Sequence, residues 1–302
     1  MKRWIKIPLV AVLGLALLGG AALVGGAQLG ERKSQRRVDV AVAAVPLAAD
    51  AAGLERGRYL FMSRGCTECH GVDGAGKDVV NDGKGMLIHA PNITPVAGGV
   101  VAGYGPADWV RTIRHGVKPD GRPLMVMPSE DYNRLTDADL GALVAFVKQL
   151  PAATGGGATV HFPLLVKALY GFGAMRDAAE KIDHALPPSQ PIAEAPTAEH
   201  GAYVANACIG CHGATLAGGK IPGAPPDWPA AANLTGTPDS ALARYPDAAA
   251  FAKMLRTGKR PDGSAVSPVM PFGALKELND TDVQAIYLHL KRLKPVPTGQ
   301  RG

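Results

Sequence analysis

The sequence predicts an all-α protein in which one small helical domain occurs twice behind an apolar N-terminal segment. A motif beginning at Cys66 returns 142 positions later at Cys208, and other matches between the halves keep an offset of 141 to 144 residues. The flanks of both motifs have helical or loop character rather than strand-rich runs. Residues 7–30 are an uncharged run, long enough to cross a bilayer as one helix. We therefore expect a duplicated domain rather than a solenoid, whose period is roughly 20 to 50 residues.

The repeated motif has the pattern C-x-x-C-H. Its chemistry-bearing residues are Cys66, Cys69 and His70 in the first copy and Cys208, Cys211 and His212 in the second. In such a motif the two thiols form thioethers with the vinyl groups of a c-type haem, and the histidine supplies one axial ligand to iron. A zinc site would need about four suitably spaced ligands, and a thioredoxin-like dithiol would need a βαβ pattern. We therefore predict two covalently attached haem c groups.

The composition suits small domains whose cores are completed by a porphyrin. Hydrophobic residues make up 47% of the chain but aromatic residues only 5%. The net charge is +6, and Lys2, Arg3 and Lys6 precede the apolar run. Because haem propionates would offset the remaining charge, the basic composition does not indicate a nucleic-acid partner.

Residues 1–30 are predicted to be a membrane anchor. A spanning helix needs about 20 apolar residues, which the run over residues 7–30 provides. A cleaved signal peptide, with a weak cleavage site at Gly25-Gly26-Ala27, is the alternative. Basic residues lie on both sides of the run, so charge alone does not determine its orientation. Residues 31–51 are predicted to be a tether.

Two domains are predicted, over residues 52–150 and 196–297. In each, a helix precedes the C-x-x-C-H motif and an amphipathic helix closes the domain. The closing helices are expected to begin at Thr136 and Asn279, whose side chains are suited to N-caps. Gly57 in the first helix predicts a close crossing with the closing helix, because glycine has no side chain to separate them.

The duplication selects the second axial ligand of each iron. Met127 aligns with Met270, and each is followed by proline. Methionine opposite histidine raises the reduction potential and closes the site to small ligands. We predict Met127 and Met270 as these ligands, the alternative being that they are core methionines that fill gaps.

Other residues near Met127 are weaker candidates for the same role. Met125 aligns with Pro268, which cannot bind iron. His89 and His115 have no histidine counterparts in the second half. These two histidines are therefore expected to be surface or hydrogen-bonding residues.

Each half resembles a class I, mitochondrial-type cytochrome c domain, with a helix, C-x-x-C-H, Met-Pro and a closing helix in that order. Over about residues 52–150 and 196–294, the N-[IL]-T, M-P and L-x-D-x-D motifs are similar to those of membrane-bound cytochrome c subunits of periplasmic alcohol, gluconate and aldehyde dehydrogenases. Those subunits have three haem sites, whereas this sequence has two and an N-terminal anchor. The diheme subunit of cbb3-type oxidases also has an anchor and two haems.

This resemblance implies haem attachment outside the cytoplasmic membrane, so both domains are expected in the periplasm, with the anchor in the cell inner membrane. It also implies a proline carbonyl as the acceptor for each axial histidine. Pro222 is the plausible match in the second domain, and Pro91 is a poorer one in the first. Buried propionates need hydrogen-bond donors, and the candidates are Tyr104, Trp109, Arg111, Arg114, Tyr245 and Arg256.

Residues 151–195 are predicted to link the domains and to contain a helix. The predicted helix extends over residues 163–183. This segment either docks on a partner or the membrane surface, or packs on the haem domains and fixes their placement, which is the preferred interpretation.

The functional expectation is a relay of single electrons. The donor would be a periplasmic dehydrogenase or a quinol-oxidising complex, and the acceptor a terminal oxidase or a soluble cytochrome. No catalytic constellation is apparent in the sequence. The alternative is a haem enzyme with one displaceable methionine, acting on a small sulfur compound or peroxide.

Overall fold

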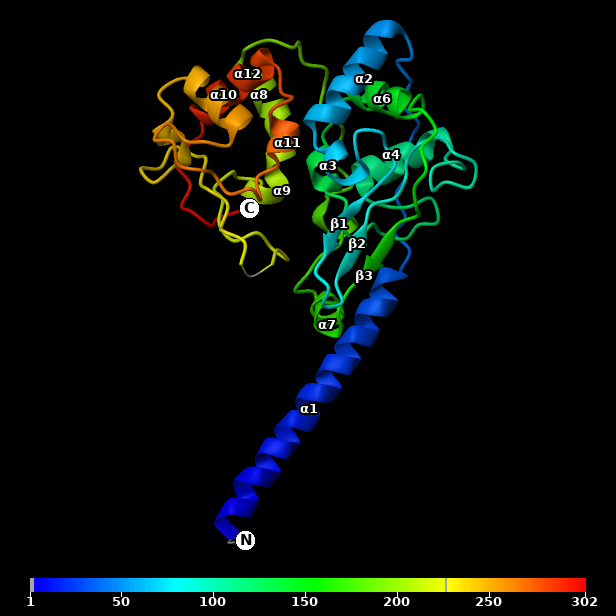
Figure 1. Cartoon of the computed structure of the whole chain (residues 1–302), viewed down its shortest axis with the longest axis vertical. Coiled ribbons are helices and arrows are strands. Elements are labelled where there is room, and N and C mark those ends of the chain that lie inside the picture. Colours follow the sequence, from blue (N-terminus) through cyan, green and yellow to red (C-terminus); the bar gives the residue numbers. More distant parts are fainter. Residues whose placement is uncertain (1–2, 226) are drawn as a thin grey trace.

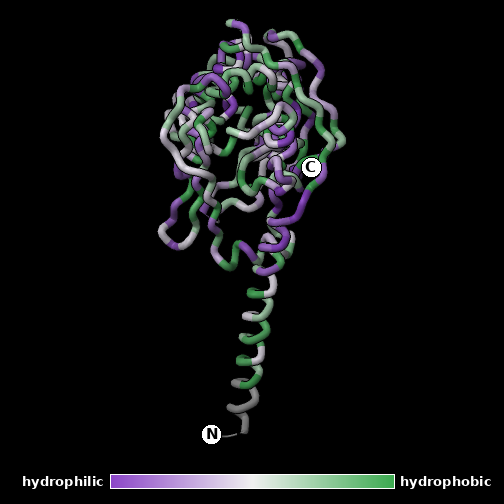
Figure 2. Tube along the Cα trace, turned by 90° about the vertical axis from the view of Figure 1, so that its right-hand side faces the viewer, coloured by the Kyte–Doolittle hydropathy of each residue, from purple (hydrophilic) through white to green (hydrophobic). Residues whose placement is uncertain are grey.

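The computed structural model describes residues 3–225 and 227–302. Two helical domains lie beside each other, and a long N-terminal helix projects from one of them (Figure 1). This helix, α1, runs from Arg3 to Ser34 and therefore includes the start of the predicted tether. Its part from Val10 to Ser34 is long and apolar enough to cross a membrane. Figure 2 shows apolar residues along the coloured part of α1 below the domains.

The first domain is built on two crossing helices. Its helices are α2 (Ala51–Ser63), α3 (Cys66–His70), α4 (Pro106–His115), α5 (Ser129–Tyr132) and α6 (Asp137–Val147). The Thr136 side chain caps α6 by accepting from the Asp139 amide at 3.1 Å, as predicted. A Cβ at Gly57 would lie 2.1 Å from the Ala142 carbonyl oxygen. The predicted crossing is therefore confirmed, and it leaves no room for a side chain at Gly57.

The second domain repeats this arrangement. Its elements are α8 (Ala198–Val204), η2 (Ala205–Cys208), α9 (Ile209–His212), η3 (Ala241–Arg244), α10 (Ala248–Thr257), α11 (Phe272–Leu275) and α12 (Asp280–Leu290), where η denotes a 3₁₀ helix. Asn279 caps α12 through the Asp282 amide at 2.8 Å, as predicted. At Gly201, where α8 crosses α12, a Cβ would lie 1.9 Å from the Ala285 carbonyl oxygen. Buried apolar residues of both domains join in one core.

A small antiparallel sheet modifies the all-α expectation. Its strands are β1 (Asp78–Asn81), β2 (Leu87–His89) and β3 (Thr159–His161), in the order β1-β2-β3. The Asp82 carboxylate accepts from the Lys84 and Met86 amides at 2.7 and 2.9 Å and so closes the turn between β1 and β2. Strands this short show too little alternation to be recognised in the sequence.

The segment between the domains is only partly helical. It contributes β3, α7 (Leu164–Gly171) and η1 (Ala179–Lys181). The expected helix over 163–183 is wrong beyond Gly171, since Gly173 has φ +79°, outside the helical region. The preferred packing on the haem domains holds for β3, which extends the sheet of the first domain, and for Ala178, whose amide donates to the Leu124 carbonyl at 2.9 Å. Helix α7 instead packs on α1.

Candidate haem sites and the interface between them

The first C-x-x-C-H motif forms the short helix α3. Gly65 begins this helix with a left-handed backbone (φ +83°), which turns the chain sharply after α2. His70 Nδ1 lies 2.9 Å from the Pro91 carbonyl oxygen, so the ring N–H donates there and Nε2 is left for a metal. Burial lowers the pKa of His70, which favours the neutral imidazole that binds metals. The Pro91 acceptor expected for this histidine is confirmed.

A cavity of about 880 Å³ adjoins this helix. Its walls include the following sequence-predicted residues: Cys66, Cys69, His70, Met127, Met125, Tyr104 and Trp109. Both Met127 and Met125 therefore reach the cavity, and the choice of Met127 as ligand stays a prediction from the duplication. Burial raises the pKa of the Cys66 thiol to about 12. The cysteine is thus neutral before reaction, as suits a group that becomes a thioether in an apolar site.

The polar atoms of the cavity wall fit a haem. Trp109 Nε1 is buried and has no hydrogen-bond partner in the part of the chain that the structure describes. A buried indole N–H without an acceptor is costly, whereas a propionate would satisfy it. Two thiols, a carbonyl-oriented imidazole and a thioether complete the donor set. The residues present therefore fit haem c.

The second motif lies in η2 and α9, and its histidine has an unexpected acceptor. His212 Nδ1 lies 2.8 Å from the carbonyl oxygen of Ala232, so the prediction of Pro222 is wrong. Ala232 precedes the Asn-Leu-Thr motif just as Pro91 precedes Asn-Ile-Thr. The constant offset between the halves relates Ala232 to Pro91 and so indicated this acceptor. The prediction considered only prolines, although any residue can supply a backbone carbonyl.

The N-[IL]-T motifs hold these acceptor carbonyls in place. Asn92 Oδ1 accepts from the amide and hydroxyl of Thr94 at 2.8 and 2.7 Å. Asn233 Oδ1 accepts from the same two groups of Thr235, both at 2.8 Å. All four side chains are buried. The motif therefore fixes the turn that follows the acceptor carbonyl of each axial histidine.

Most of the other propionate-donor candidates have protein partners instead. Arg114 donates to the Leu135 carbonyl at 2.6 Å and pairs with Asp137 at 2.8 Å. Arg111 pairs with Asp108, and Arg256 pairs with Asp280. Tyr245 is buried in the core.

The two rejected histidines are hydrogen-bonded as expected. His89 Nδ1 lies 2.7 Å from Asp78 Oδ1, across the β1–β2 pair. His115 Nδ1 lies 3.1 Å from His184 Nδ1. Neither arrangement requires a metal.

Equivalent residues of the two domains exchange hydrogen bonds across their interface. Tyr59 of α2 donates to Asp282 of α12 at 2.7 Å, and Tyr203 of α8 donates to Asp139 of α6 at 2.6 Å. Each hydroxyl also accepts from an N-cap amide of the other domain, Asn279 at 3.2 Å and Thr136 at 3.3 Å. The same two hydrogen bonds therefore occur twice in the interface, once around the tyrosine of each domain.

The two carboxylates of this interface have different additional partners. Arg56 forms a bidentate pair with Asp139 at 2.8 and 2.9 Å. Asp282 instead accepts from His200 at 2.7 Å and from Arg64 at 2.8 Å, and its side chain is fully buried. Although burial opposes ionisation, the charge of Arg64 and the hydrogen bonds hold the pKa of Asp282 below its ordinary value.

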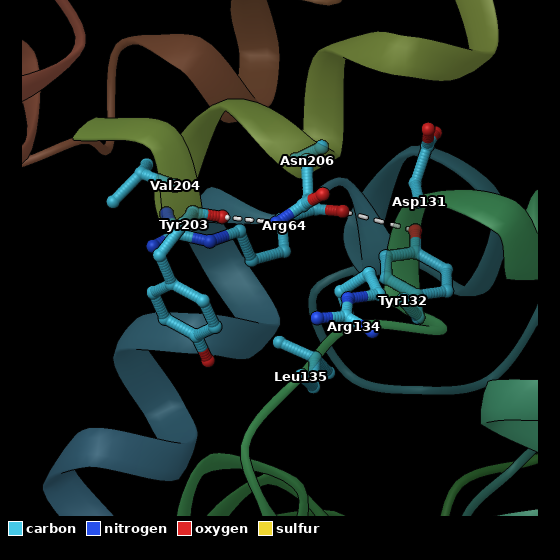
Figure 3. Close-up of a pocket in the computed structure, with 9 residues that line it drawn as sticks. Arg64, Asp131, Tyr132, Arg134, Leu135, Tyr203, Val204 and Asn206 are labelled. Carbon is cyan, nitrogen blue, oxygen red and sulfur yellow. Dashed lines mark hydrogen bonds between the residues drawn. The ribbon is translucent and has the colours of Figure 1, made fainter. Parts of the chain in front are cut away.

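Each haem-attachment helix also contacts the other domain. The Asp131 carboxylate of α5 accepts from the Gly210 amide in α9 at 2.8 Å. A Cβ at Gly273 in α11 would lie 2.1 Å from Glu68 Oε1 in α3. Figure 3 shows Arg64 between Tyr132 of the first domain and Tyr203 of the second; the Tyr132 hydroxyl donates to the Arg64 carbonyl at 2.9 Å. Both attachment helices therefore border the interface.

Comparison with known families agrees with this architecture. Residues 52–147 match the family "Cytochrome C oxidase, cbb3-type, subunit III", and residues 198–294 match the family "Cytochrome c". The chain is 28% identical over 275 residues to the fructose dehydrogenase cytochrome subunit of Gluconobacter japonicus, with 82% of this chain and 54% of that subunit covered.

Two further relatives are subunits of dehydrogenases. The cytochrome c subunit of alcohol dehydrogenase (quinone) from Gluconacetobacter polyoxogenes is 28% identical over 285 residues, covering 83% of this chain and 58% of that subunit. The gluconate 2-dehydrogenase cytochrome c subunit of Pantoea cypripedii is 34% identical over 98 residues, which are 31% of this chain and 22% of that protein. The chain spans just over half the length of the fructose and alcohol dehydrogenase subunits. It therefore belongs to the cytochromes c, as a diheme protein of two tandem domains similar to these dehydrogenase subunits.

Proposed function

We propose that this protein is a membrane-anchored periplasmic cytochrome that carries two haem c groups and relays single electrons. The donor is a dehydrogenase or a quinol-oxidising complex, and the acceptor is a terminal oxidase or a soluble cytochrome. The observation that carries the proposal is the reciprocal docking of two like domains, which brings both attachment helices to one interface.

The residues of each domain have distinct tasks in this proposal. The covalent and axial positions are assigned to Cys66, Cys69, His70 and Met127 in the first domain and to Cys208, Cys211, His212 and Met270 in the second. Haem c supplies a one-electron iron couple when bound. The carbonyls of Pro91 and Ala232 orient the two imidazoles, and burial lowers the pKa of both.

The interface favours transfer within the molecule over catalysis at an open site. Contacts of α5 with α9 and of α11 with α3 hold each attachment helix against the other domain. With Met127 and Met270 as second iron ligands beside His70 and His212, bound haem would have no coordination position open to a substrate. An electron can thus cross between the domains while their relative placement stays fixed.

The proposed partners and location rest on the relatives and on α1. Several relatives are cytochrome subunits of fructose, alcohol and gluconate dehydrogenases, which supports a dehydrogenase as donor. The match of the first domain to a cbb3-type oxidase subunit family supports a link to respiratory oxidation. Helix α1 would hold the protein in the inner membrane, with both domains on the periplasmic side.

Optical spectra of the purified holoprotein test the ligand assignment. We expect two low-spin haems, a methionine-to-iron charge-transfer band in the oxidised form, and no spectral change when CO is added to the reduced form. Met127→Ala and Met270→Ala should each remove half of that band, open one iron to CO and lower one reduction potential. Met125→Ala is the matched control and should behave as the unmodified protein.

Two results would contradict the proposal. CO binding by the unmodified protein would leave one iron open and favour a haem enzyme. A full charge-transfer band in Met270→Ala would show that another residue is the ligand in the second domain.

A further inference from the structure

The helix between the two domains has an apolar face that is exposed to solvent. Leu165, Leu169 and Phe172 follow one another at helical spacing in and just after α7, and they are 60%, 39% and 60% exposed. Ala168 and Tyr170 are buried. An exposed apolar stripe on a helix whose other side is packed marks a contact surface for something else.

Helix α7 lies against the end of the apolar run of α1 (Figure 1). A Cβ at Gly30 would be 2.2 Å from the Lys167 carbonyl oxygen, and a Cβ at Gly171 would be 2.1 Å from the Gly26 carbonyl oxygen. The Phe172 ring covers Gly26. The two helices are thus in backbone contact at the level where the uncharged stretch gives way to Glu31 and the basic residues after it.

Polar side chains hold this crossing rigidly. Arg36 donates to the fully buried Asp177 at 2.5 and 3.0 Å, and the Tyr170 hydroxyl donates to the same carboxylate at 2.6 Å. Lys33 donates to the Tyr170 carbonyl at 3.2 Å and pairs with Glu180 at 2.9 Å. The depth of α7 along α1 is therefore fixed by the fold.

We propose that α7 lies in the membrane interface and that the lipid bilayer covers Leu165, Leu169 and Phe172. This inference rests on the proposed role of α1 as a membrane anchor. An apolar core about 30 Å thick takes about 20 residues of α1, so Gly26 and Gly30 lie near its outer boundary. The apolar face of an interfacial helix reaches about 5–10 Å into the headgroup and acyl boundary, which is where this crossing places α7.

The charges around the crossing suit phospholipid headgroups. Arg32, Arg37 and Arg176 are exposed at the end of α1 and just after α7. Basic residues beside an apolar face strengthen binding to anionic lipid surfaces. The apolar face also continues the lipid-facing surface of α1, on which Val24 and Leu29 are each 48% exposed. This continuity favours the bilayer over a protein partner as the occupant.

With α7 in the membrane interface, the first domain would lie next to the membrane. The cavity that contains His70 and Met127 is also lined by Gly30 and Glu31 of α1 and by Tyr170 of α7. One end of that cavity therefore adjoins the membrane-facing side of the protein. The second domain lies beside the first (Figure 1).

Cysteine accessibility of the full-length holoprotein in lipid nanodiscs tests the proposed position of α7. Three single variants are compared: Leu165→Cys on α7, Leu17→Cys on α1 (75% exposed) and Leu47→Cys (45% exposed). Leu47 lies beside α6, at the end of the first domain away from α1 (Figure 1). Each variant is treated with a membrane-impermeant maleimide. We expect Leu165→Cys to be as poorly labelled as Leu17→Cys, while Leu47→Cys is labelled fully.

The other outcomes separate this inference from the anchor on which it rests. If Leu165→Cys reacts like Leu47→Cys while Leu17→Cys is protected, α1 is a membrane anchor but the proposed position of α7 in the membrane interface is overturned. If Leu17→Cys also reacts, the anchor itself fails. If Leu165→Cys is reactive in nanodiscs but protected in native membranes, a protein covers α7 and the lipid proposal is overturned.

Discussion

The two haem domains share one interface design but differ in what surrounds it. Tyr59 and Tyr203 occupy equivalent positions and donate to the equivalent carboxylates Asp282 and Asp139. Among the described residues of this interface, a buried arginine comes only from the first domain: Arg64, whose counterpart by offset is Asn206. The tyrosine–carboxylate hydrogen bond occurs twice, with the tyrosine supplied once by each domain, whereas the charge of Arg64 comes from the first domain. The symmetric pair therefore defines the docking, and Arg64 makes the two halves electrostatically unequal.

The domains also differ in their attachment to the rest of the chain. The first domain carries the three-stranded sheet and lies next to α1 and α7. Within the described residues, no strand of this sheet comes from the second domain. Variants at the reciprocal interface should therefore report on the docking of the second domain.

Loss of the Arg64 charge should have the largest effect on stability. Arg64→Met keeps much of the volume but leaves Asp282 buried without its cation, which costs about 3–5 kcal/mol when one member of a buried pair is removed. The measurement is chemical denaturation of the holoprotein. Asn206→Ala, at the equivalent position, should change the free energy of unfolding far less. Adding Asp282→Asn to Arg64→Met should restore part of the loss; an unchanged loss in the double variant would argue against the pair.

The two interface tyrosines should have smaller and similar effects. Tyr59→Phe and Tyr203→Phe each remove a hydrogen bond to a buried carboxylate, worth about 1.5–3 kcal/mol for a bond to a charged group. Because the bonds are equivalent by duplication, the two losses in thermal or denaturant stability should agree within about 1 kcal/mol. A large loss in one variant and none in the other would show that the docking is not symmetric.

Acid should weaken the interface gradually, with the smallest effect near neutrality. The pKa values of Asp139 and Asp282 are lowered in the folded protein despite burial, through Arg56 and Arg64 respectively and through hydrogen bonds. A depressed folded pKa gives stability that is present above the unfolded pKa, about 3.9, and lost as the pH falls through the folded value. Denaturation midpoints should therefore decline below about pH 4. The decline should be shallower in Asp282→Asn, and parallel curves would contradict this assignment.

Local features of the sequence predicted much of the fold. Thr136 and Asn279 were identified as N-caps because the capping bond joins residues three apart in the chain. Gly57 indicated a helix crossing because only glycine permits such close backbone contact. The strands could not be predicted in the same way, since three or four residues are too few for a pattern and β3 pairs with a strand at least 70 positions earlier.

Part of the candidate site depended on backbone atoms, about which residue types say little. The carbonyl of Ala232 orients His212, and nothing in the side chain of alanine indicates this role. Asp139 has the sequence position of a favourable acid in a first helical turn, yet it is buried and accepts from Tyr203 of the other domain. Sequence spacing cannot distinguish a solvated helix start from a buried one.

The sequence by itself determined the chemistry of this protein: two C-x-x-C-H motifs, an apolar N-terminal run, and a duplication whose constant offset pairs Met127 with Met270. Only the tertiary structure decided how the copies meet and where α7 lies. Tyr59 and Asp282 are 223 residues apart, and α7 reaches α1 across more than 130 residues. Contacts over such separations arise from packing and burial, which have no local signature, whereas covalent attachment, capping and helix periodicity are properties of adjacent residues.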